Sequence, residues 1–241
     1  MNTSQTLQQM KELKLAGMAN SYTYQLELSL DQQLEGHELI GHLLQAEQLH
    51  RGNERMATLV KAARFRYHTL PEHIECTDAR NLNKAQWATL LEGRYLTQGD
   101  NILITGSTGC GKSAIASALG YQACMMGIKT RYYNMNRLIE AILIAKTDGS
   151  YLKLLNQFEK IPLIIIDDFG MQNLNKNIKL ALLQIIEDRY AKRSLIITSQ
   201  LPVSNWYDYL DEPQLADALM DRMTAKSHRL ELKGESRRKK K

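Results

Sequence analysis

The sequence predicts an α/β fold, a three-layer sandwich in which helices cover both faces of a five-stranded parallel sheet. Two observations predict it. From residue 101 onward, short apolar runs alternate with helical patterns, which is typical of parallel strands joined by crossover helices. Before residue 100 there is no strand-like alternation, so we expect the first part of the chain to be entirely helical. A chain of 241 residues can hold one such domain and a smaller helical one.

The N-terminal part contains two helical patterns. Apolar residues recur at helical spacing from Leu7 until Gly17, which we expect to interrupt the helix. A longer pattern runs from about residue 38 to residue 65, Pro71 marks a polar connector, and residues 85–91 form one more short helix. We therefore expect a helical domain at 1–70, an α/β domain at 71–233 and a basic tail at 234–241.

The second part of the chain supplies the sheet and its covering helices. The apolar runs predict strands at residues 101–105, 129–133, 163–167, 195–198 and 229–232. The helical patterns predict helices at residues 112–126, 136–146, 151–159, 176–190 and 214–225.

A phosphate-binding P-loop pattern joins the first of these strands to the first helix, in the segment NILITGSTGCGKS. Its glycines allow backbone N–H groups to turn inward around phosphates, Lys112 offers an ammonium to the β and γ oxygens, and the Ser113 hydroxyl suits Mg²⁺. A plain glycine turn is the alternative, but a match of this length arises by chance in about one chain in a hundred. The residues expected to hold a nucleotide are Gly106, Ser107, Thr108, Gly109, Cys110, Gly111, Lys112 and Ser113.

Two carboxylates follow the strand expected at 163–167, in the run LIIIDD. A strand this apolar is expected to be buried on both faces, with the acids at its C-terminal end beside the phosphates. In this interpretation Asp167 holds Mg²⁺ through water and Asp168 polarises the attacking water. Acidic residues are common in turns after strands, but after a P-loop the metal-binding interpretation is favoured.

Two further places have polar residues that suit a nucleotide site. Ser199 and Gln200 follow the strand expected at 195–198, where a hydroxyl or amide could sense the γ-phosphate. Arg222 lies on a late helix and could act as a finger on the nucleotide of a neighbouring subunit. Its alternative role is that of a surface residue paired with a nearby acid such as Asp221.

The net charge of +5 is unevenly distributed. Residues 226–241 hold eight Lys or Arg against two Glu, and residues 51–68 hold five against Glu54. Such patches suit a polyanion like DNA, since each neutralised phosphate releases counterions; the alternative is a solvated helix face and a disordered tail. The residues expected to contact DNA are Arg51, Arg55, Lys61, Arg64, Arg66, Arg237 and Arg238.

Other sequence features point to a cytoplasmic protein. No uncharged run reaches the ~20 apolar residues of a membrane span, and the N-terminus lacks the apolar core of a secretory signal. The three cysteines show no CxxC spacing, so neither a disulfide framework nor a zinc site is indicated. We therefore expect no membrane association and a reducing environment.

Six blocks carry a resemblance over nearly the whole chain: LKLAGM, AEQLHRGNER, GSTGCGKS, LIIIDDFG, IEDRYAKRSLIITSQLPVSNWY and LADALMDRMTAKSHRLELKGESRRK. In these blocks the chain resembles the IstB family, the ATP-binding helper proteins of insertion-sequence transposition, in the AAA+ class beside the helicase loader DnaC. The resemblance implies an AAA+ core with strand order 5-1-4-3-2, ATP-dependent oligomerisation on duplex DNA, and delivery of that DNA to a transposase. DNA contact should be mainly to phosphates.

The resemblance also assigns roles by position. Lys112 and Ser113 become the Walker A groups, and Asp167 and Asp168 the Walker B pair. Ser199 or Gln200 falls at sensor 1, and Arg222 at the arginine finger.

Two departures from general AAA+ form affect the expected mechanism. Asp168 stands where most AAA+ proteins have Glu, so its carboxylate reaches less far and slow, switch-like hydrolysis is expected. Only nine residues follow the last predicted strand, too few for a helical lid, so the sensor 2 arginine is missing or replaced by Arg237 or Arg238. The alternatives are a replicative helicase loader like DnaC and, less favoured, a small-molecule kinase, for which no acceptor site or closing lid is evident.

Overall fold

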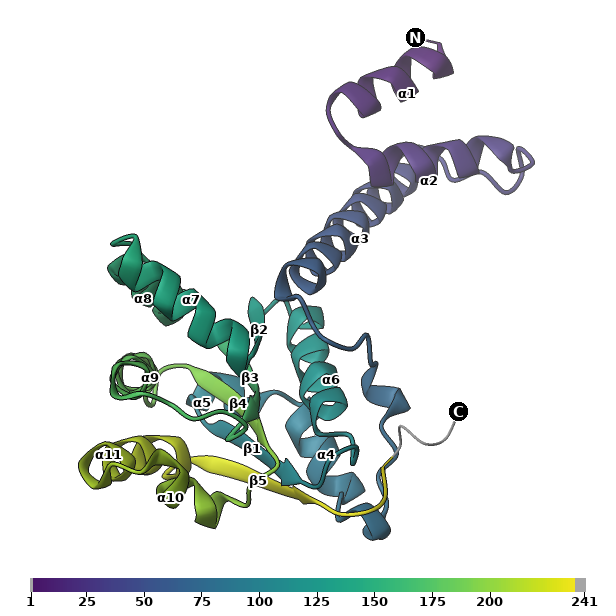
Figure 1. Ribbon diagram of the computed structural model, residues 1–241. Helices are drawn as coiled ribbons and strands as arrows, with labels where there is room; N and C mark the ends of the chain where they lie inside the picture. Colours follow the sequence, from purple (N-terminus) through teal and green to yellow (C-terminus); the bar gives the residue numbers. More distant parts are fainter. Residues whose placement is uncertain (1, 237–241) are drawn as a thin grey trace. The chain divides into compact units, whose positions relative to one another are not determined.

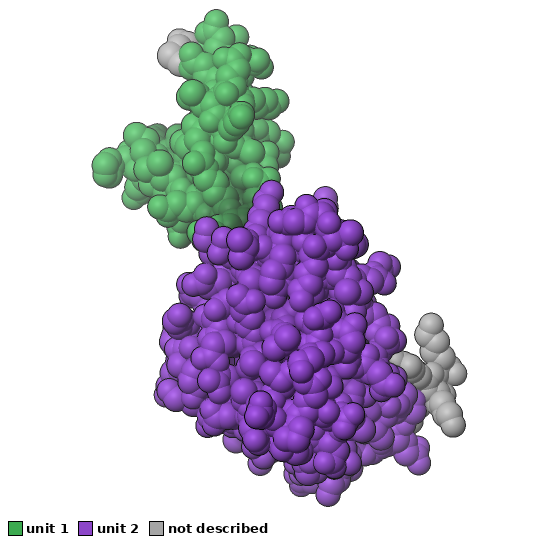
Figure 2. Space-filling view, turned by 60° about the vertical axis from the view of Figure 1, so that its left-hand side comes forward, with its two compact units in different colours: residues 1–58 green, residues 59–241 purple. Residues whose placement is uncertain are grey.

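The computed structural model describes residues 2–236 (Figure 1). The chain forms two compact units, Met1–Thr58 (unit 1) and Leu59–Lys241 (unit 2), shown in green and purple in Figure 2. The division falls earlier than the boundary expected at residue 70. The reason is that the segment at the end of α3 already belongs to unit 2: Ala63 is fully buried, and the Phe65 ring lies against the core of that unit. Arg131 adds a hydrogen bond to the Ala62 carbonyl at 2.6 Å.

Unit 1 is helical, as expected. It contains α1 (Thr3–Glu12), α2 (Ala16–Glu27) and most of α3 (Gly36–Ala63), which continues into unit 2. The expected break at Gly17 is wrong, because α1 ends before Leu13 and Gly17 lies inside α2. A Cβ on Gly17 would lie 2.6 Å from the carbonyl oxygen of Ala46 on α3. This glycine therefore allows two helices to pack closely and does not end a helix.

Unit 2 contains the predicted five-stranded parallel sheet, in the order β2-β3-β4-β1-β5. The strand order 5-1-4-3-2 implied by the resemblance is therefore confirmed. The strands are β1 (Asn101–Gly106), β2 (Thr130–Asn134), β3 (Leu163–Phe169), β4 (Ser194–Ser199) and β5 (Ser227–Leu232).

Helices cover both faces of this sheet and complete the three layers (Figure 1). The helices are α4 (Lys84–Leu91), α5 (Arg94–Gln98), α6 (Lys112–Met125), α7 (Met135–Thr147), α8 (Tyr151–Lys160), α9 (Lys176–Arg189), α10 (Trp206–Leu210) and α11 (Pro213–Thr224), with 3₁₀ turns at Pro71–His73, Asp78–Arg80 and Val203–Asn205. Because side chains alternate along a strand, Ile102 and Ile104 face the core beneath α4 and α6, whereas Leu103 faces the core beneath α7 to α11.

Two of these helices have no counterpart in the sequence-based expectation. The helices α5 and α10 each have five residues, too few for helical periodicity to show. All other helices of unit 2 begin and end close to the predicted positions. Among the described residues, no helix combines the length and apolar character needed to cross a membrane.

Candidate nucleotide site

The predicted phosphate loop connects the end of β1 to the start of α6. Gly106, Gly109 and Gly111 have φ angles of 145°, 84° and 100°, which L side chains rarely adopt. At Gly106 a Cβ would also lie 2.4 Å from the carbonyl oxygen of Leu232. Glycine is therefore favoured at these three positions. Such a backbone is what a loop needs to turn its N–H groups inward around an anion.

Lys112 is the first residue of α6 and is buried. Its Nζ donates to the carbonyl oxygens of Gly106 and Ser107, both at 2.8 Å. The ammonium thus lies against the loop at the N-terminus of a 14-residue helix. Helix dipole, free N–H groups and ammonium all favour an anion at this point, so the loop fits a phosphate group.

Neighbouring segments hold the loop from outside. Arg80, which is buried, donates from its guanidinium to the carbonyl of Cys110 at 3.1 Å, and its backbone carbonyl accepts from the N–H of Lys233 at 3.0 Å. The Ser107 hydroxyl lies 3.5 Å from the carbonyl oxygen of Gly234. The chain that follows β5 therefore runs along the phosphate loop.

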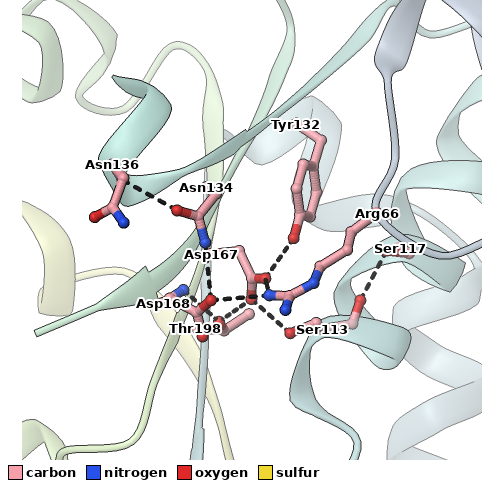
Figure 3. Close-up of polar contacts among 9 residues, drawn as sticks. All are labelled: Arg66, Ser113, Ser117, Tyr132, Asn134, Asn136, Asp167, Asp168 and Thr198. Atoms are coloured by element: carbon pink, nitrogen blue, oxygen red, sulfur yellow. Dashed lines mark hydrogen bonds and ion pairs between the residues drawn. The ribbon is translucent and has the colours of Figure 1, made fainter. Parts of the chain in front are cut away.

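Asp167 lies fully buried on β3, and both of its carboxylate oxygens accept hydrogen bonds (Figure 3). Oδ1 accepts from Ser113 Oγ at 2.8 Å and from the Thr198 hydroxyl. Oδ2 accepts from the Tyr132 hydroxyl and from Arg66 NH1 at 3.3 Å. Burial, together with the negative charge of Asp167, raises the pKa of the Tyr132 hydroxyl, so Tyr132 stays protonated as a donor.

Asp168 lies beside it, with a side chain 27% exposed. The strand β3 runs past the predicted end, and an irregularity in its pairing with β4 lies between Ile166 and Phe169. Asp168 has a φ of 64° there, and its N–H donates to Thr198 Oγ1 at 3.1 Å. Its Oδ2 accepts from Asn134 Nδ2 at 2.8 Å and Arg66 NH1 at 2.9 Å. The bulge thus turns two consecutive carboxylates toward one place, although residues adjacent in a regular strand point to opposite faces.

The end of β4 contributes three polar residues with different contacts. Gln200 reaches the phosphate loop, because its Oε1 accepts the Thr108 hydroxyl at 2.7 Å. Ser199 is buried and donates to the carbonyl of Phe169 at 2.6 Å. Thr198, which the sequence did not single out, binds Asp167 and the N–H of Asp168.

Arg222 lies at the C-terminal end of α11, away from the phosphate loop of its own chain. Its guanidinium pairs with Glu187 of α9 and lies 3.6 Å from Asp221. Its carbonyl oxygen accepts from Asn101 Nδ2 at 3.1 Å. Since Asn101 begins β1 and the loop follows Gly106 at the other end, Arg222 and Lys112 lie at opposite ends of this strand.

Three further side chains contact Asp167 or Asp168 and form with them what we call the carboxylate cluster. These three come from parts of the chain without a motif: Arg66, Tyr132 and Asn134. Tyr132 and Asn134 are two residues apart on β2, so they lie on the same face of the sheet, and Asn134 is the register partner of Asp167 on β3. A polar residue at the end of a strand is a signal that could have identified Asn134, whereas Tyr132, inside the strand, has no such signal. For Arg66, in the segment after α3, the sequence offers no local signal beyond its charge.

The residues present fit a magnesium nucleotide. Among the described residues, no group of three or more His, Cys, Asp and Glu side chains is placed to hold a metal. Ser113 and Asp167 offer a hydroxyl and a carboxylate 2.8 Å apart, and Mg²⁺ typically adds phosphate oxygens and water to so few protein ligands. A bound Mg²⁺ would neutralise phosphate charge beside Lys112.

Comparison with known proteins assigns the chain to a family. The profile described as IstB-like ATP binding protein matches residues 8–241. The chain belongs to the IstB-like family. An insertion-sequence ATP-binding protein of Sinorhizobium fredii is 36% identical over 233 residues, covering 97% of this chain and 95% of that protein. The ATP-binding protein of insertion sequence IS1162 from Pseudomonas fluorescens is 39% identical over 205 residues, covering 85% and 89%.

Solved structures show the same AAA+ fold as this IstB-like chain. The DnaC helicase loader matches with a TM-score of 0.59 and 20% identity, over 69% of this chain and 98% of that one. AMPPCP-bound DnaA from Aquifex aeolicus matches with a TM-score of 0.57 and 19% identity, over 68% and 49%. The chain is thus an IstB-like ATP-binding protein with an AAA+ fold.

Proposed function

We propose that the protein is a slow, regulatory Mg²⁺-dependent ATPase that binds duplex DNA, assembles on it with ATP, and delivers it to a partner transposase. The proposed ATPase activity rests on the contact between the phosphate loop and the acidic residues of β3. Ser113 of the phosphate loop donates to Asp167 at 2.8 Å, and Asp168 lies next to it with its carboxylate partly exposed. In this proposal Ser113 and Asp167 hold Mg²⁺, Lys112 binds the phosphates, and Asp168 orients the attacking water.

Slow hydrolysis follows from the contacts of Asp168. Its Oδ2 is held by two donors, Asn134 and Arg66, and an aspartate is one methylene shorter than the glutamate of most AAA+ proteins. With both donors on Oδ2, the attacking water is left with Oδ1 of a carboxylate whose direction is already fixed. We therefore expect the nucleotide state to change slowly and to act as a signal.

A shared site between subunits is the proposed basis of ATP-dependent assembly. Arg222 and Lys112 lie at opposite ends of β1, so Arg222 is suited to reach the nucleotide of a neighbouring subunit. Its side chain is 29% exposed and must leave Glu187 to do so. Gln200, held at the loop by Thr108, is the better placed of the two proposed sensor residues.

DNA binding is proposed to be electrostatic. Arg51 and Arg55 are four residues apart on α3, so both project from one face of that helix, and both are exposed. Lys61 and Arg64 follow along the chain and are also exposed. Arg51 pairs with Glu47 at 2.7 Å, but its side chain remains 61% exposed. Arg66 differs, because it is paired with both carboxylates of the nucleotide site, so the DNA proposal rests on the other four. Arg237 and Arg238 lie outside the described residues.

The transposase partner is proposed from the relatives, which are named as insertion-sequence proteins. A helicase loader is the second candidate, favoured by the likeness to the fold of DnaC. The two differ in their partner: co-purification with a replicative helicase in place of a transposase would reverse the choice.

Turnover measurements test the ATPase proposal. ATP hydrolysis should be stimulated by duplex DNA, abolished in Lys112→Ala and in Asp168→Asn, and unchanged in the control Lys153→Ala, an exposed lysine on α8. Stimulation by a small metabolite and not by DNA would instead indicate a kinase.

A further inference from the structure

The segment that follows α3 brings an arginine to the nucleotide site. Arg64 has a φ of 59° and leaves the helix direction immediately after Ala63. Phe65 then packs against α6 at Gly120, where a Cβ would lie 2.5 Å from the Phe65 ring. Because only glycine leaves room for this ring, Phe65 fixes the segment on unit 2 and fixes where the next residue projects.

Arg66 projects from this anchor onto both carboxylates. One nitrogen, NH1, lies 2.9 Å from Asp168 Oδ2 and 3.3 Å from Asp167 Oδ2 (Figure 3). Asp167 is fully buried, whereas the Arg66 side chain is 39% exposed. The guanidinium thus supplies positive charge to a buried carboxylate from the solvent side. Because it is already partly hydrated, it can leave the carboxylate and move fully into water.

A guanidinium at this point competes with a metal cation for the negative charge of the same carboxylate. Oδ1 of Asp167 already accepts two hydroxyls, so Oδ2 is the oxygen that depends on Arg66 for its charge partner. A divalent cation held by Asp167 and a guanidinium within 3.3 Å of that carboxylate would repel each other across a short, partly buried distance. Binding of a divalent cation at the carboxylates therefore favours release of the Arg66 guanidinium, and the reverse.

We propose that Arg66 is a displaceable latch on the Walker B carboxylates, which competes with Mg²⁺ for the charge of Asp167 and occupies Oδ2 of Asp168 until magnesium nucleotide displaces it. This inference rests on the proposed binding of Mg²⁺ and ATP. It assigns Arg66 to control of the ATP site. Arg66 lies three residues after the end of α3, the helix that carries Arg51 and Arg55, so its release frees the segment next to the proposed DNA-binding helix.

Magnesium titration tests the latch. Binding of a fluorescent ATP analogue is measured against Mg²⁺ concentration, and again in EDTA, for the wild type, Arg66→Gln and Arg193→Gln. Arg193 is the control, because it is an exposed arginine outside the proposed nucleotide and DNA sites. Arg66→Gln should lower the Mg²⁺ concentration at half-saturation by about tenfold, within the usual range for coupling between two ligands. It should leave affinity in EDTA unchanged, and Arg193→Gln should behave as the wild type.

Each other result has a defined meaning. An unchanged or weaker Mg²⁺ response in Arg66→Gln overturns the latch, and lost affinity in EDTA shows that Arg66 is instead a phosphate ligand. If the wild type binds no nucleotide, the proposed function fails and the latch with it.

Hydrogen exchange of the wild type gives a second test that needs no variant. Backbone amides of residues 64–70 should exchange faster with Mg²⁺ and ATP than without. Equal or slower exchange would contradict displacement of the segment.

Discussion

The separation of Arg222 from the phosphate loop of its own chain makes a subunit-mixing experiment quantitative. The two ends of β1, marked by Asn101 and Gly106, lie roughly 16 Å apart at the usual rise of a strand. The Arg222 backbone contacts the first end and Lys112 the second. If each active site takes Lys112 from one subunit and Arg222 from the next, Lys112→Ala and Arg222→Ala damage different halves of it.

The expected magnitudes follow from this geometry. Each variant alone should lose about 10³-fold or more of DNA-stimulated ATP turnover, the usual contribution of an arginine finger. In an equal mixture, a site is whole when an intact Lys112 meets an intact Arg222 from its neighbour. In such a mixture each of these two residues is intact with a probability of one half. About one quarter of wild-type turnover should therefore return if subunits exchange freely.

The assay is ATP turnover on duplex DNA at fixed total protein, with the fraction of each variant varied from zero to one. Recovery should peak at equal amounts. As a control, Arg193→Ala, an exposed arginine elsewhere, should keep full activity alone. A mixture no more active than its components would refute a site shared through Arg222 and would favour Arg222 as a structural partner of Glu187.

Three further predictions concern packing, the carboxylate cluster and DNA. Gly17→Ala should destabilise unit 1 by about 1 to 3 kcal/mol, since its Cβ would collide with the backbone of α3. Gly41→Ala, whose Cβ meets no atom within 4 Å, should instead stabilise the helix by roughly 0.5 to 1 kcal/mol. Thermal unfolding of the two variants tests this difference. Tyr132→Phe removes a donor to buried Asp167 and should lower the free energy of unfolding by about 1.5 to 3 kcal/mol in urea titrations; an unchanged midpoint would contradict the contact. Arg51→Ala and Arg55→Ala should each reduce the slope of log affinity for DNA against log salt by about 1.

The parts of the site that were predictable are those encoded within one short segment. The phosphate loop is contiguous, so its glycines, Lys112 and Ser113 could be assigned from spacing and lie at the end of β1 as expected. Asp167 and Asp168 follow from an apolar strand that ends in acids, although the bulge that turns both toward one place has no sequence signal.

The parts that were not predictable depend on tertiary pairing. Tyr132 reaches Asp167 because β2 pairs with β3 in one register, which a single sequence does not specify. Arg66 reaches the carboxylates because Phe65 anchors its segment at Gly120, more than fifty residues away in the chain. Gly17 was misread for a similar reason, since a glycine that breaks a helix and one that permits close helix packing look alike before the partner helix is known.

Sedimentation of the protein on duplex DNA tests the central claim most directly. Analytical ultracentrifugation should show a larger protein–DNA assembly with Mg²⁺ and ATP than with Mg²⁺ alone, and Lys112→Ala should give the smaller species in both conditions. Assemblies of equal size with and without ATP, or wild-type assemblies formed by Lys112→Ala, would contradict the claim that the nucleotide site controls assembly on DNA.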